Sequence, residues 1–190
     1  MNRFGRTDLC AVLTSDIVIN SGTFDADGRY TPAAGETVSG MNPIGSETQP
    51  YTGTFDGGGY TIRGLRVSKR YYYNSNGGGF DEGNHAGLFG KLSGATVKNL
   101  TVTGYVDGRF YVGGIAGCAR GQVEIKNCVN NATVSSLARG SAGVGGLVGG
   151  YDDGVEYVYK NIRMTVDGCT NNGTINVTGA NTDAKVGGLV

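Results

Sequence analysis

Short runs in which apolar and polar residues alternate recur along the chain, and glycine or asparagine separates them. Successive residues of a β-strand point to opposite faces, so a run such as Leu100, Thr101, Val102 predicts a strand with one buried face. No stretch of ten or more residues within the repeated units shows the 3.6-residue period of a helix. The pattern therefore predicts an all-β protein built from many short strands.

Two repeated patterns organise these strands. A glycine motif occurs as HAGLFG at 85–90, VGGIAG at 112–117, VGGLVG at 144–149 and, shortened, VGGLV at 186–190. Segments that resemble one another also occur at 61–67, 96–102, 124–130 and 165–171. The glycine motifs begin 27, 32 and 42 residues apart. Repeats of this length with three short strands predict a right-handed single-stranded parallel β-helix of about four to five coils. We expect one such domain over residues 1–190.

Stacked coils of a parallel β-helix place equivalent residues above one another, about 4.8 Å apart. One interior ladder is then expected to contain Leu88, Ile115, Leu147 and Leu189. A second is expected to contain Leu65, Leu100, Cys128 and Cys169. Asparagine followed by a small residue at 130–132 and 171–173 predicts a corner of the coil. The paired glycines are expected where one coil passes close to the next.

The glycine motifs AGLFG, GGIAG and GGLVG resemble those of the bacterial GLUG-repeat proteins. Residues 42–67, with NPIG and TFDGGGYTI, are similar to the leading coil that often precedes such repeats, and residues 13–19 resemble the strand before it. The resemblance covers about residues 13–190. It implies a parallel β-helix of secreted or surface-anchored proteins, including adhesin-like proteins and regions that flank the catalytic part of immunoglobulin A-specific metallopeptidases. It supplies no catalytic residues.

Composition and charge narrow the function further. The 16 basic and 16 acidic residues form no basic cluster, so a nucleic-acid partner is not expected. No apolar run is long enough to predict a membrane span. The single histidine, His85, excludes an H-E-x-x-H zinc protease site, and the four cysteines form no C-x-x-C pair. We expect no cofactor, no metal site and no enzymatic activity in this chain.

A polysaccharide-cleaving enzyme is the main alternative, because such a site needs charged groups that converge from adjacent coils. It would lie near Asp107, Arg109 and the two insertions described below. However, Asp107 is expected to align with Ser135 and Asn176, which builds no cluster of carboxylates.

Two smaller motifs leave alternatives open. DADG at 25–28 resembles the start of a calcium-binding loop, but the residues that follow lack alternating oxygen ligands, which favours a surface turn. Cys128 and Cys169 share one expected ladder position and could form a disulfide, although two reduced thiols packed in the core are favoured.

Two insertions, 69–84 and 150–164, hold six of the 11 tyrosines. Tyrosine rings next to amide and carboxylate groups suit sugars or a protein partner. A competing interpretation is that these rings only cover the flank of the solenoid. The predicted ligand contacts are Tyr71, Tyr72, Tyr73, Asp152, Asp153, Tyr157 and Tyr159.

Together these features predict a non-catalytic β-helix module of a secreted or cell-surface bacterial protein, acting as a rigid stalk or an adhesive surface. Its expected partner is a glycan or a surface protein. A pure spacer beside a peptidase domain outside the chain is a further alternative. The last glycine motif ends at Val190 without a polar cap, so we expect further coils or another chain to cover that end.

Overall fold

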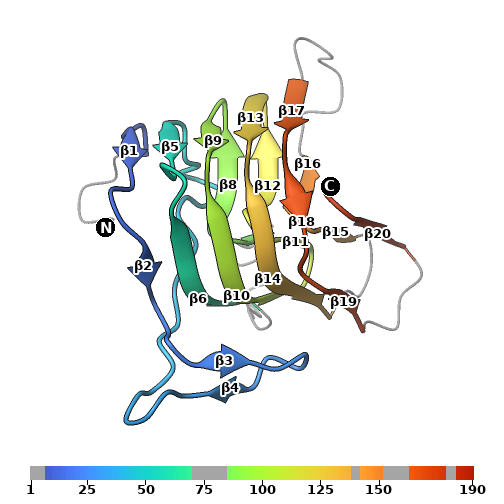
Figure 1. Cartoon of the computed structure of the whole chain (residues 1–190). Coiled ribbons are helices and arrows are strands. Elements are labelled where there is room, and N and C mark those ends of the chain that lie inside the picture. Colours follow the sequence, from blue (N-terminus) through green and yellow to red (C-terminus); the bar gives the residue numbers. More distant parts are fainter. Residues whose placement is uncertain (1–6, 70–84, 138–141, 152–162, 179–182) are drawn as a thin grey trace.

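The computed structural model describes residues 7–69, 85–137, 142–151, 163–178 and 183–190. These residues form twenty short strands and no helix. Eighteen of the strands belong to four sheets in which every pair is parallel, and the remaining two form an antiparallel hairpin. The all-β prediction is confirmed, and the stacked parallel sheets are those of a solenoid (Figure 1).

The chain visits the four sheets in order, and strands from successive passes of the chain lie next to one another in each sheet. The first sheet contains β1 (Ala11–Val12), β5 (Thr54–Asp56), β9 (Thr96–Lys98), β13 (Gln122–Lys126) and β17 (Arg163–Asp167). The second contains β2 (Ile17–Val18), β6 (Thr61–Ser68), β10 (Thr101–Gly108), β14 (Val129–Ser136) and β18 (Thr170–Asn171), with β19 (Ile175–Val177) also paired to β14.

The other two sheets lie behind these in Figure 1. The third contains β7 (His85–Ala86), β11 (Tyr111–Gly113), β15 (Ala142–Gly145) and β20 (Ala184–Gly187). The fourth contains β8 (Phe89–Ser93), β12 (Ala116–Arg120) and β16 (Val148–Tyr151). Aliphatic and aromatic side chains from all four sheets fill one shared core.

The interior ladder of the glycine motifs is confirmed. Leu88, Ile115 and Leu147 are buried, and backbone hydrogen bonds link their coils, for example from Ile115 N to the Leu147 carbonyl at 2.9 Å. Leu189 continues the ladder through the bond from Leu147 N to its carbonyl, also 2.9 Å. Its side chain is 39% exposed because it lies in the last described coil.

The second ladder is confirmed in three of its four members. Leu100, Cys128 and Cys169 follow one another, with Thr170 N donating to the Cys128 carbonyl at 2.9 Å. The placement of Leu65 is wrong, because Leu65 lies beside Gly104 and not beside Leu100. Strand β6 carries one extra residue there, since Arg63 and Gly64 together oppose a single residue of β10, and this bulge shifts the register.

The expected corner at 130–132 is also wrong. Strand β14 runs through these residues without interruption, and the side chain of Asn130 is buried and bonds to the backbone N and carbonyl of Ala132. The turn between the first and second sheets lies a few residues earlier, at Asn99 and Asn127, whose φ angles are 53° and 52°. Asparagine tolerates this left-handed backbone better than other residues with a side chain.

Residues 21–38 leave the solenoid as an excursion that carries the hairpin of β3 (Thr23–Phe24) and β4 (Tyr30–Thr31), seen at the bottom of Figure 1. The chain then rejoins the first coil, where Met41 N donates to the Arg66 carbonyl at 2.8 Å. The hairpin packs on the outer face of the second sheet, since the Phe24 ring stacks on Tyr105 with centroids 6.3 Å apart. It thereby covers one part of that face and leaves another part open.

Candidate ligand-binding groove

The predicted ligand contacts Tyr71, Tyr72, Tyr73, Asp152, Asp153, Tyr157 and Tyr159 lie outside the described residues. The ends of the two insertions are described. Lys69 N donates to the Asp107 carbonyl at 2.9 Å, strand β16 extends through Tyr151, and β17 begins at Arg163. The described part of the chain offers a different candidate site, a groove beside the β3–β4 hairpin.

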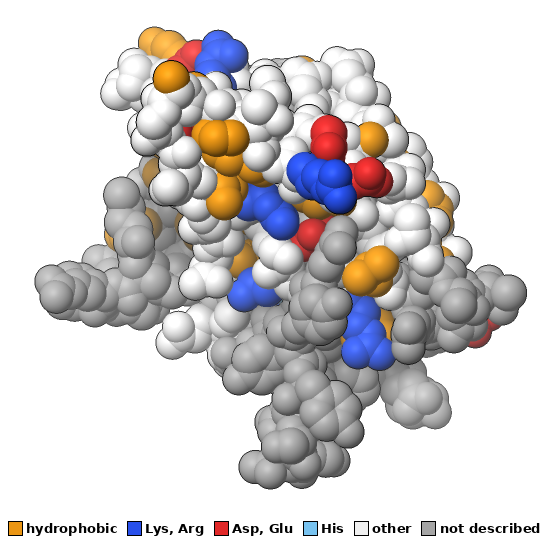
Figure 2. Space-filling view, turned by 90° about the horizontal axis from the view of Figure 1, so that it is seen from below, with side chains coloured by type: hydrophobic (Ala, Val, Ile, Leu, Met, Phe, Trp, Pro, Cys, Tyr) orange, Lys and Arg blue, Asp and Glu red, His pale blue; other side chains and the backbone are white. Residues whose placement is uncertain are grey.

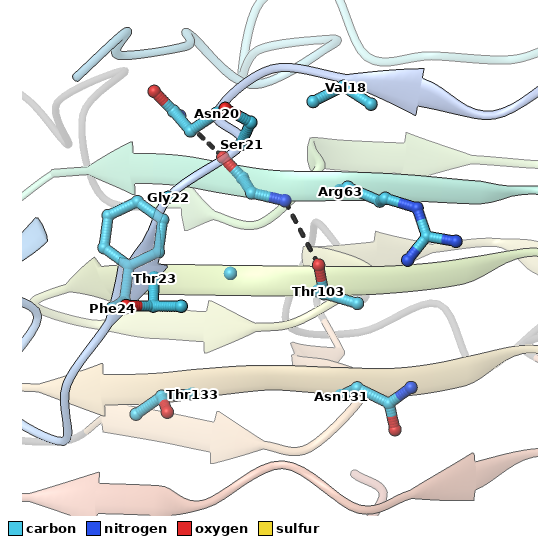
Figure 3. Close-up of a pocket in the computed structure, with 12 residues that line it drawn as sticks. Val18, Asn20, Ser21, Gly22, Thr23, Phe24, Arg63, Thr103, Asn131 and Thr133 are labelled. Atoms are coloured by element: carbon cyan, nitrogen blue, oxygen red, sulfur yellow. Dashed lines mark hydrogen bonds between the residues drawn. The ribbon is translucent and has the colours of Figure 1, made fainter. Parts of the chain in front are cut away.

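The floor of this groove is the open part of the outer face of the second sheet. Thr103 on β10 and Asn131 on β14 are register partners, and Arg63 of β6 lies on the other side of Thr103. Figure 3 shows these three side chains one below the other on successive strands, with Thr133 beside Asn131 on the same strand. Because residues two apart on a strand share a face, Asn131 and Thr133 both point into the groove.

The wall of the groove comes from the chain that leads into the hairpin, from Val18 through Phe24. Asn20 fixes this wall, because its buried side chain donates from Nδ2 to the Gly64 carbonyl at 2.6 Å. In Figure 3 the Phe24 ring and the Arg63 guanidinium lie on opposite sides of the groove. The groove is open to solvent, and its volume of about 460 Å³ is within the range of small-molecule sites.

The charge of the groove is balanced. The Arg63 guanidinium donates from Nε and Nη2 to Asp16 Oδ2, at 3.1 and 2.9 Å. A hydrogen bond from Thr61 N, together with Arg63, lowers the pKa of Asp16, so the carboxylate stays charged at neutral pH. Among the described residues that line the groove, none is Asp or Glu, and Arg63 is the single charged one.

The floor residues keep hydrogen-bonding capacity for a ligand. Thr103 Oγ1 accepts from Gly64 N at 3.1 Å, which leaves its hydroxyl proton to donate. Asn131 Oδ1 accepts from Asn172 Nδ2 at 3.0 Å, which leaves its own Nδ2 group to donate. The floor therefore presents neutral donors in a row, next to one aromatic ring and one paired guanidinium.

This groove is not among the sites predicted from the sequence. One feature of the sequence does indicate the floor of the groove. The segments TVTGYV at 101–106 and VNNATV at 129–134 both place hydroxyl or amide side chains at alternate positions. The wall carried no comparable signal, since the hairpin belongs to no repeat.

The alternative site at Asp107 has a different environment. As predicted, Asp107 pairs with Ser135, and Ser135 with Asn176. However, the Asp107 side chain is only 2% exposed and its Oδ2 lies 3.6 Å from Arg66 Nη1. Arg66 in turn lies over the Tyr105 ring, 5.2 Å from its centroid. Within the described residues this is an ion pair between a buried carboxylate of β10 and a partly buried guanidinium of β6.

Arg109, the other residue assigned to that alternative, is placed against an aromatic ring. Its guanidinium lies 5.0 Å from the centroid of Phe110. The two residues of the alternative site therefore belong to separate contacts in the described structure.

The DADG segment forms a turn whose carboxylate serves the backbone. Asp25 Oδ1 accepts from Asp27 N and Arg29 N, at 3.0 and 2.9 Å. Glu36 accepts from Ser21 N and the Tyr30 hydroxyl. Hydrogen bonding by the Ser21 side chain and by Tyr30 lowers the pKa of Glu36. Among the described residues, no three His, Cys, Asp or Glu side chains come together in a way that could hold a metal ion.

The two cysteines of the second ladder are adjacent and reduced in this structure. Cys128 N lies 3.4 Å from Cys169 Sγ. Burial raises the pKa of the Cys128 thiol to about 12, so this thiol stays protonated at neutral pH.

A cluster of charged and titratable side chains that was not predicted from the sequence joins the third and fourth sheets, through His85 of β7 and Lys91 of β8, to Glu47. Lys91 Nζ donates to Glu47 Oε1 at 2.6 Å, and His85 Nδ1 lies 3.5 Å from Glu47 Oε2. The His85 ring also packs on Tyr111, with centroids 5.3 Å apart. Because Lys91 is fully buried, this pair anchors the 45–50 segment to β8.

Charges are mixed on the face seen in Figure 2. Basic and acidic side chains of the described residues lie beside one another there and form no large patch of one sign. In the described part of the chain, no helix has the length and apolar character needed to cross a lipid bilayer.

No protein-family model matches the chain, so the likeness to GLUG repeats rests on the motifs alone. The chain is 34% identical over 117 residues to halomucin of Haloquadratum walsbyi (strain DSM 16790 / HBSQ001). The match covers 58% of this chain and 1% of halomucin, so the chain spans only a small fraction of that protein.

Among solved structures, the chain is similar to a crystal structure of a Bacteroides ovatus protein provisionally described as an immunoglobulin A1 protease. The sequences are 19% identical, the TM-score is 0.49, and the alignment covers 96% of this chain and 64% of the other.

Proposed function

We propose that the chain is a non-catalytic module of a secreted or cell-surface protein that binds a glycan in the groove beside the β3–β4 hairpin. The observation that carries this proposal is the row of neutral donors on adjacent strands, Thr103 and Asn131, next to a charge-balanced arginine and across the groove from an aromatic ring. Sugars offer hydroxyl groups to such donors and apolar ring faces to an aromatic side chain.

The scaffold of this module is proposed to be a right-handed parallel β-helix. The support is the order in which the chain visits the sheets, from β5 through β6, β7 and β8 to β9, which pairs with β5. Connections between parallel strands of one sheet are almost always right-handed. Stacked coils of this kind form a stiff rod, which suits a stalk that presents a binding face.

The absence of catalysis is part of the proposal. Its support is the environment of Asp107, whose carboxylate is buried against Arg66, and the lack of acidic residues in the groove lining. Hydrolysis of a glycosidic bond by the usual mechanism needs two carboxyl groups on either side of the bond. The groove lining offers none.

A location outside the cell is proposed from two observations. One is the similarity of 117 residues to halomucin, and the other is the resemblance of the glycine motifs to GLUG repeats of secreted and surface proteins. The Tyr-rich insertions at 69–84 and 150–164 are still predicted to form a second surface that contacts a glycan or a surface protein.

A mixed array of host and microbial glycans tests the function. It is read with the wild-type chain, with a Thr103→Ala/Asn131→Ala double variant, and with a Tyr71→Ala/Tyr72→Ala/Tyr73→Ala triple variant. Thr101→Ala is the matched control, because Thr101 lies on the same face of β10 but outside the groove lining.

We expect the wild type and the control to bind and the double variant to lose binding. Loss in the triple variant alone would move the site to the first insertion. An array on which the wild type binds nothing would favour the spacer interpretation.

A further inference from the structure

We infer that the groove takes a linear, neutral polysaccharide that runs along the solenoid axis, with successive sugar units lying over successive strands. This inference rests on the proposed function, because it specifies the class and direction of the glycan. It is carried by the spacing of the floor residues, by the continuation of their row beyond the groove, and by the charge balance of Arg63.

The floor residues repeat with the step of the solenoid. Arg63, Thr103 and Asn131 come from β6, β10 and β14, which are adjacent in the second sheet. Neighbouring strands lie about 4.8 Å apart. This distance is close to the length of one pyranose unit in an extended chain, so each unit of such a chain meets the side chain of one strand.

The row extends one coil beyond the enclosed groove. Asn172, which follows β18, donates from Nδ2 to Asn131 Oδ1 at 3.0 Å and is exposed. The Oδ1 atom of Asn172 can accept a hydrogen bond from a sugar hydroxyl group. A ligand that followed the strands would leave Asn172 out, whereas a ligand that follows the axis reaches it after Thr103 and Asn131.

The other side of the groove supports the same direction. Figure 3 shows Phe24 and Thr133 along one side, and Arg63, Thr103 and Asn131 along the other. A chain between these two columns runs across the strands. The aromatic ring would then meet one sugar face from the hairpin side of the groove.

Charge selects neutral sugars over acidic ones. The only charged group in the groove lining, Arg63, already donates two hydrogen bonds to Asp16. A uronate or sialate would have to displace Asp16 or bind without a free cation. A neutral ligand leaves this ion pair intact, and its affinity should depend little on salt.

The test is titration calorimetry of the whole chain with oligosaccharides of two to six units. Cello-, laminari- and chito-oligosaccharides are the neutral linear probes, and oligogalacturonates are the acidic probes. In at least one neutral series we expect Kd to fall with each unit up to about four units and then to level off. We expect that series to bind at least about tenfold more tightly than oligogalacturonates of equal length, with little change between low and high salt.

Two variants test separately whether the site exists and whether the ligand runs along the solenoid axis. Thr103→Ala should weaken binding of short and long oligosaccharides alike, by about three- to tenfold for one lost hydrogen bond. Asn172→Ala should weaken the tetrasaccharide and longer probes by a similar factor and leave the disaccharide unchanged. Thr170→Ala is the control, since Thr170 lies in the same coil outside the row.

Three results would overturn the inference while the proposed function stands. They are a Kd that does not change beyond the disaccharide, tighter and salt-sensitive binding of oligogalacturonates, and array binding restricted to branched glycans. Array binding that does not respond to Thr103→Ala, or no array binding at all, would instead contradict the proposed function itself.

Discussion

Asn20 and Ser39 are joined by two hydrogen bonds that close the excursion between them. Asn20 Nδ2 donates to the Ser39 carbonyl at 3.0 Å, and Asn20 Oδ1 accepts from Ser39 N at 2.7 Å. The same Nδ2 group also donates to the Gly64 carbonyl. One buried amide therefore holds both ends of the segment that carries the β3–β4 hairpin, and ties them to the second sheet.

Asn20→Ala should loosen the hairpin and with it the wall of the groove. The change removes three hydrogen bonds from a side chain that is 3% exposed and leaves backbone groups of Ser39 and Gly64 without these partners. We expect a loss of about 1 to 3 kcal/mol in the free energy of unfolding. Denaturant unfolding measures it, and glycan binding should weaken in parallel.

Thr37→Ala, an exposed change within the same excursion, is the control for this variant and should leave both stability and binding nearly unchanged. Unaltered hydrogen exchange in residues 21–38 of Asn20→Ala would contradict the assigned role of Asn20.

The glycine motif allows a matched test of close packing between coils. A Cβ atom at Gly146 would overlap the Asn171 side chain and the Gly188 carbonyl oxygen. A Cβ atom at Gly188, the same motif position one coil later, would meet nothing within 4 Å. Neither glycine has a positive φ, so the comparison isolates the overlap from backbone strain.

Gly146→Ala should therefore lower the free energy of unfolding by about 1 to 3 kcal/mol, whereas Gly188→Ala should change it by less than about 0.5 kcal/mol. Thermal unfolding of the two variants side by side makes the measurement. Equal effects would mean that the motif does not mark a contact between coils in this protein.

The repeat could be predicted from the sequence, whereas the bulge and the corner that interrupt its regular strands could not. Ladder positions inside the regular coils were predictable, as the alignment of Asp107 with Ser135 shows, because the same motif recurs in each coil. Leu65 was misplaced because the bulge at Gly64 adds one residue to β6, and no other coil carries a copy of it. The corner was misplaced because Asn127 and Asn130 are equally suited to a turn by residue type alone.

The groove was harder to foresee than the solenoid. Its floor follows the repeat, but its wall depends on where a non-repeated hairpin folds back. That position is set by contacts such as Phe24 on Tyr105, between residues 81 positions apart in the chain. Periodicity carries no information on such a contact, whereas an exposed row of Thr and Asn on adjacent strands does indicate an accessible face.

Acid should destabilise the first coils through two carboxylates. Hydrogen bonds from Gly58 N and Asn99 Nδ2, with Lys98 nearby, lower the pKa of Asp56 from its ordinary value of 3.8. Because the native pKa is lower than the unfolded one, this carboxylate stabilises the fold above about pH 4, and the stabilisation is lost as the pH falls through the native pKa. Asp16 has the same direction of shift, caused by Thr61 N and Arg63.

We expect the melting temperature of the wild type to drop between pH 4.5 and 3, and to drop less steeply in Asp56→Asn and Asp16→Asn. Asp27→Asn, at the exposed tip of the hairpin, is the control. Parallel pH profiles for all four proteins would show that these hydrogen bonds do not set the acid sensitivity.

Alkali should destabilise the core through Cys128. Its pKa rises from an ordinary 9.0 to about 12, mainly because the thiol is buried. Above about pH 9 the unfolded chain releases this proton while the native chain keeps it, so the unfolded state gains relative stability as the pH rises. Cys128→Val removes the titrating group and keeps an apolar side chain in the ladder beside Leu100. The midpoint of denaturant unfolding should therefore fall less between pH 8.5 and 11 in the variant than in the wild type.

Thiol alkylation followed by mass spectrometry shows whether Cys128 is a free thiol or forms a disulfide with Cys169. In the native protein at neutral pH the exposed Cys10 should react quickly and Cys128 slowly, and both should react after unfolding without reductant. If unfolded Cys128 and Cys169 react only after reduction, the pair forms a disulfide across the ladder. The alkaline effect would then be absent, because a disulfide sulfur has no proton to release, and the wild type and Cys128→Val would share one pH profile.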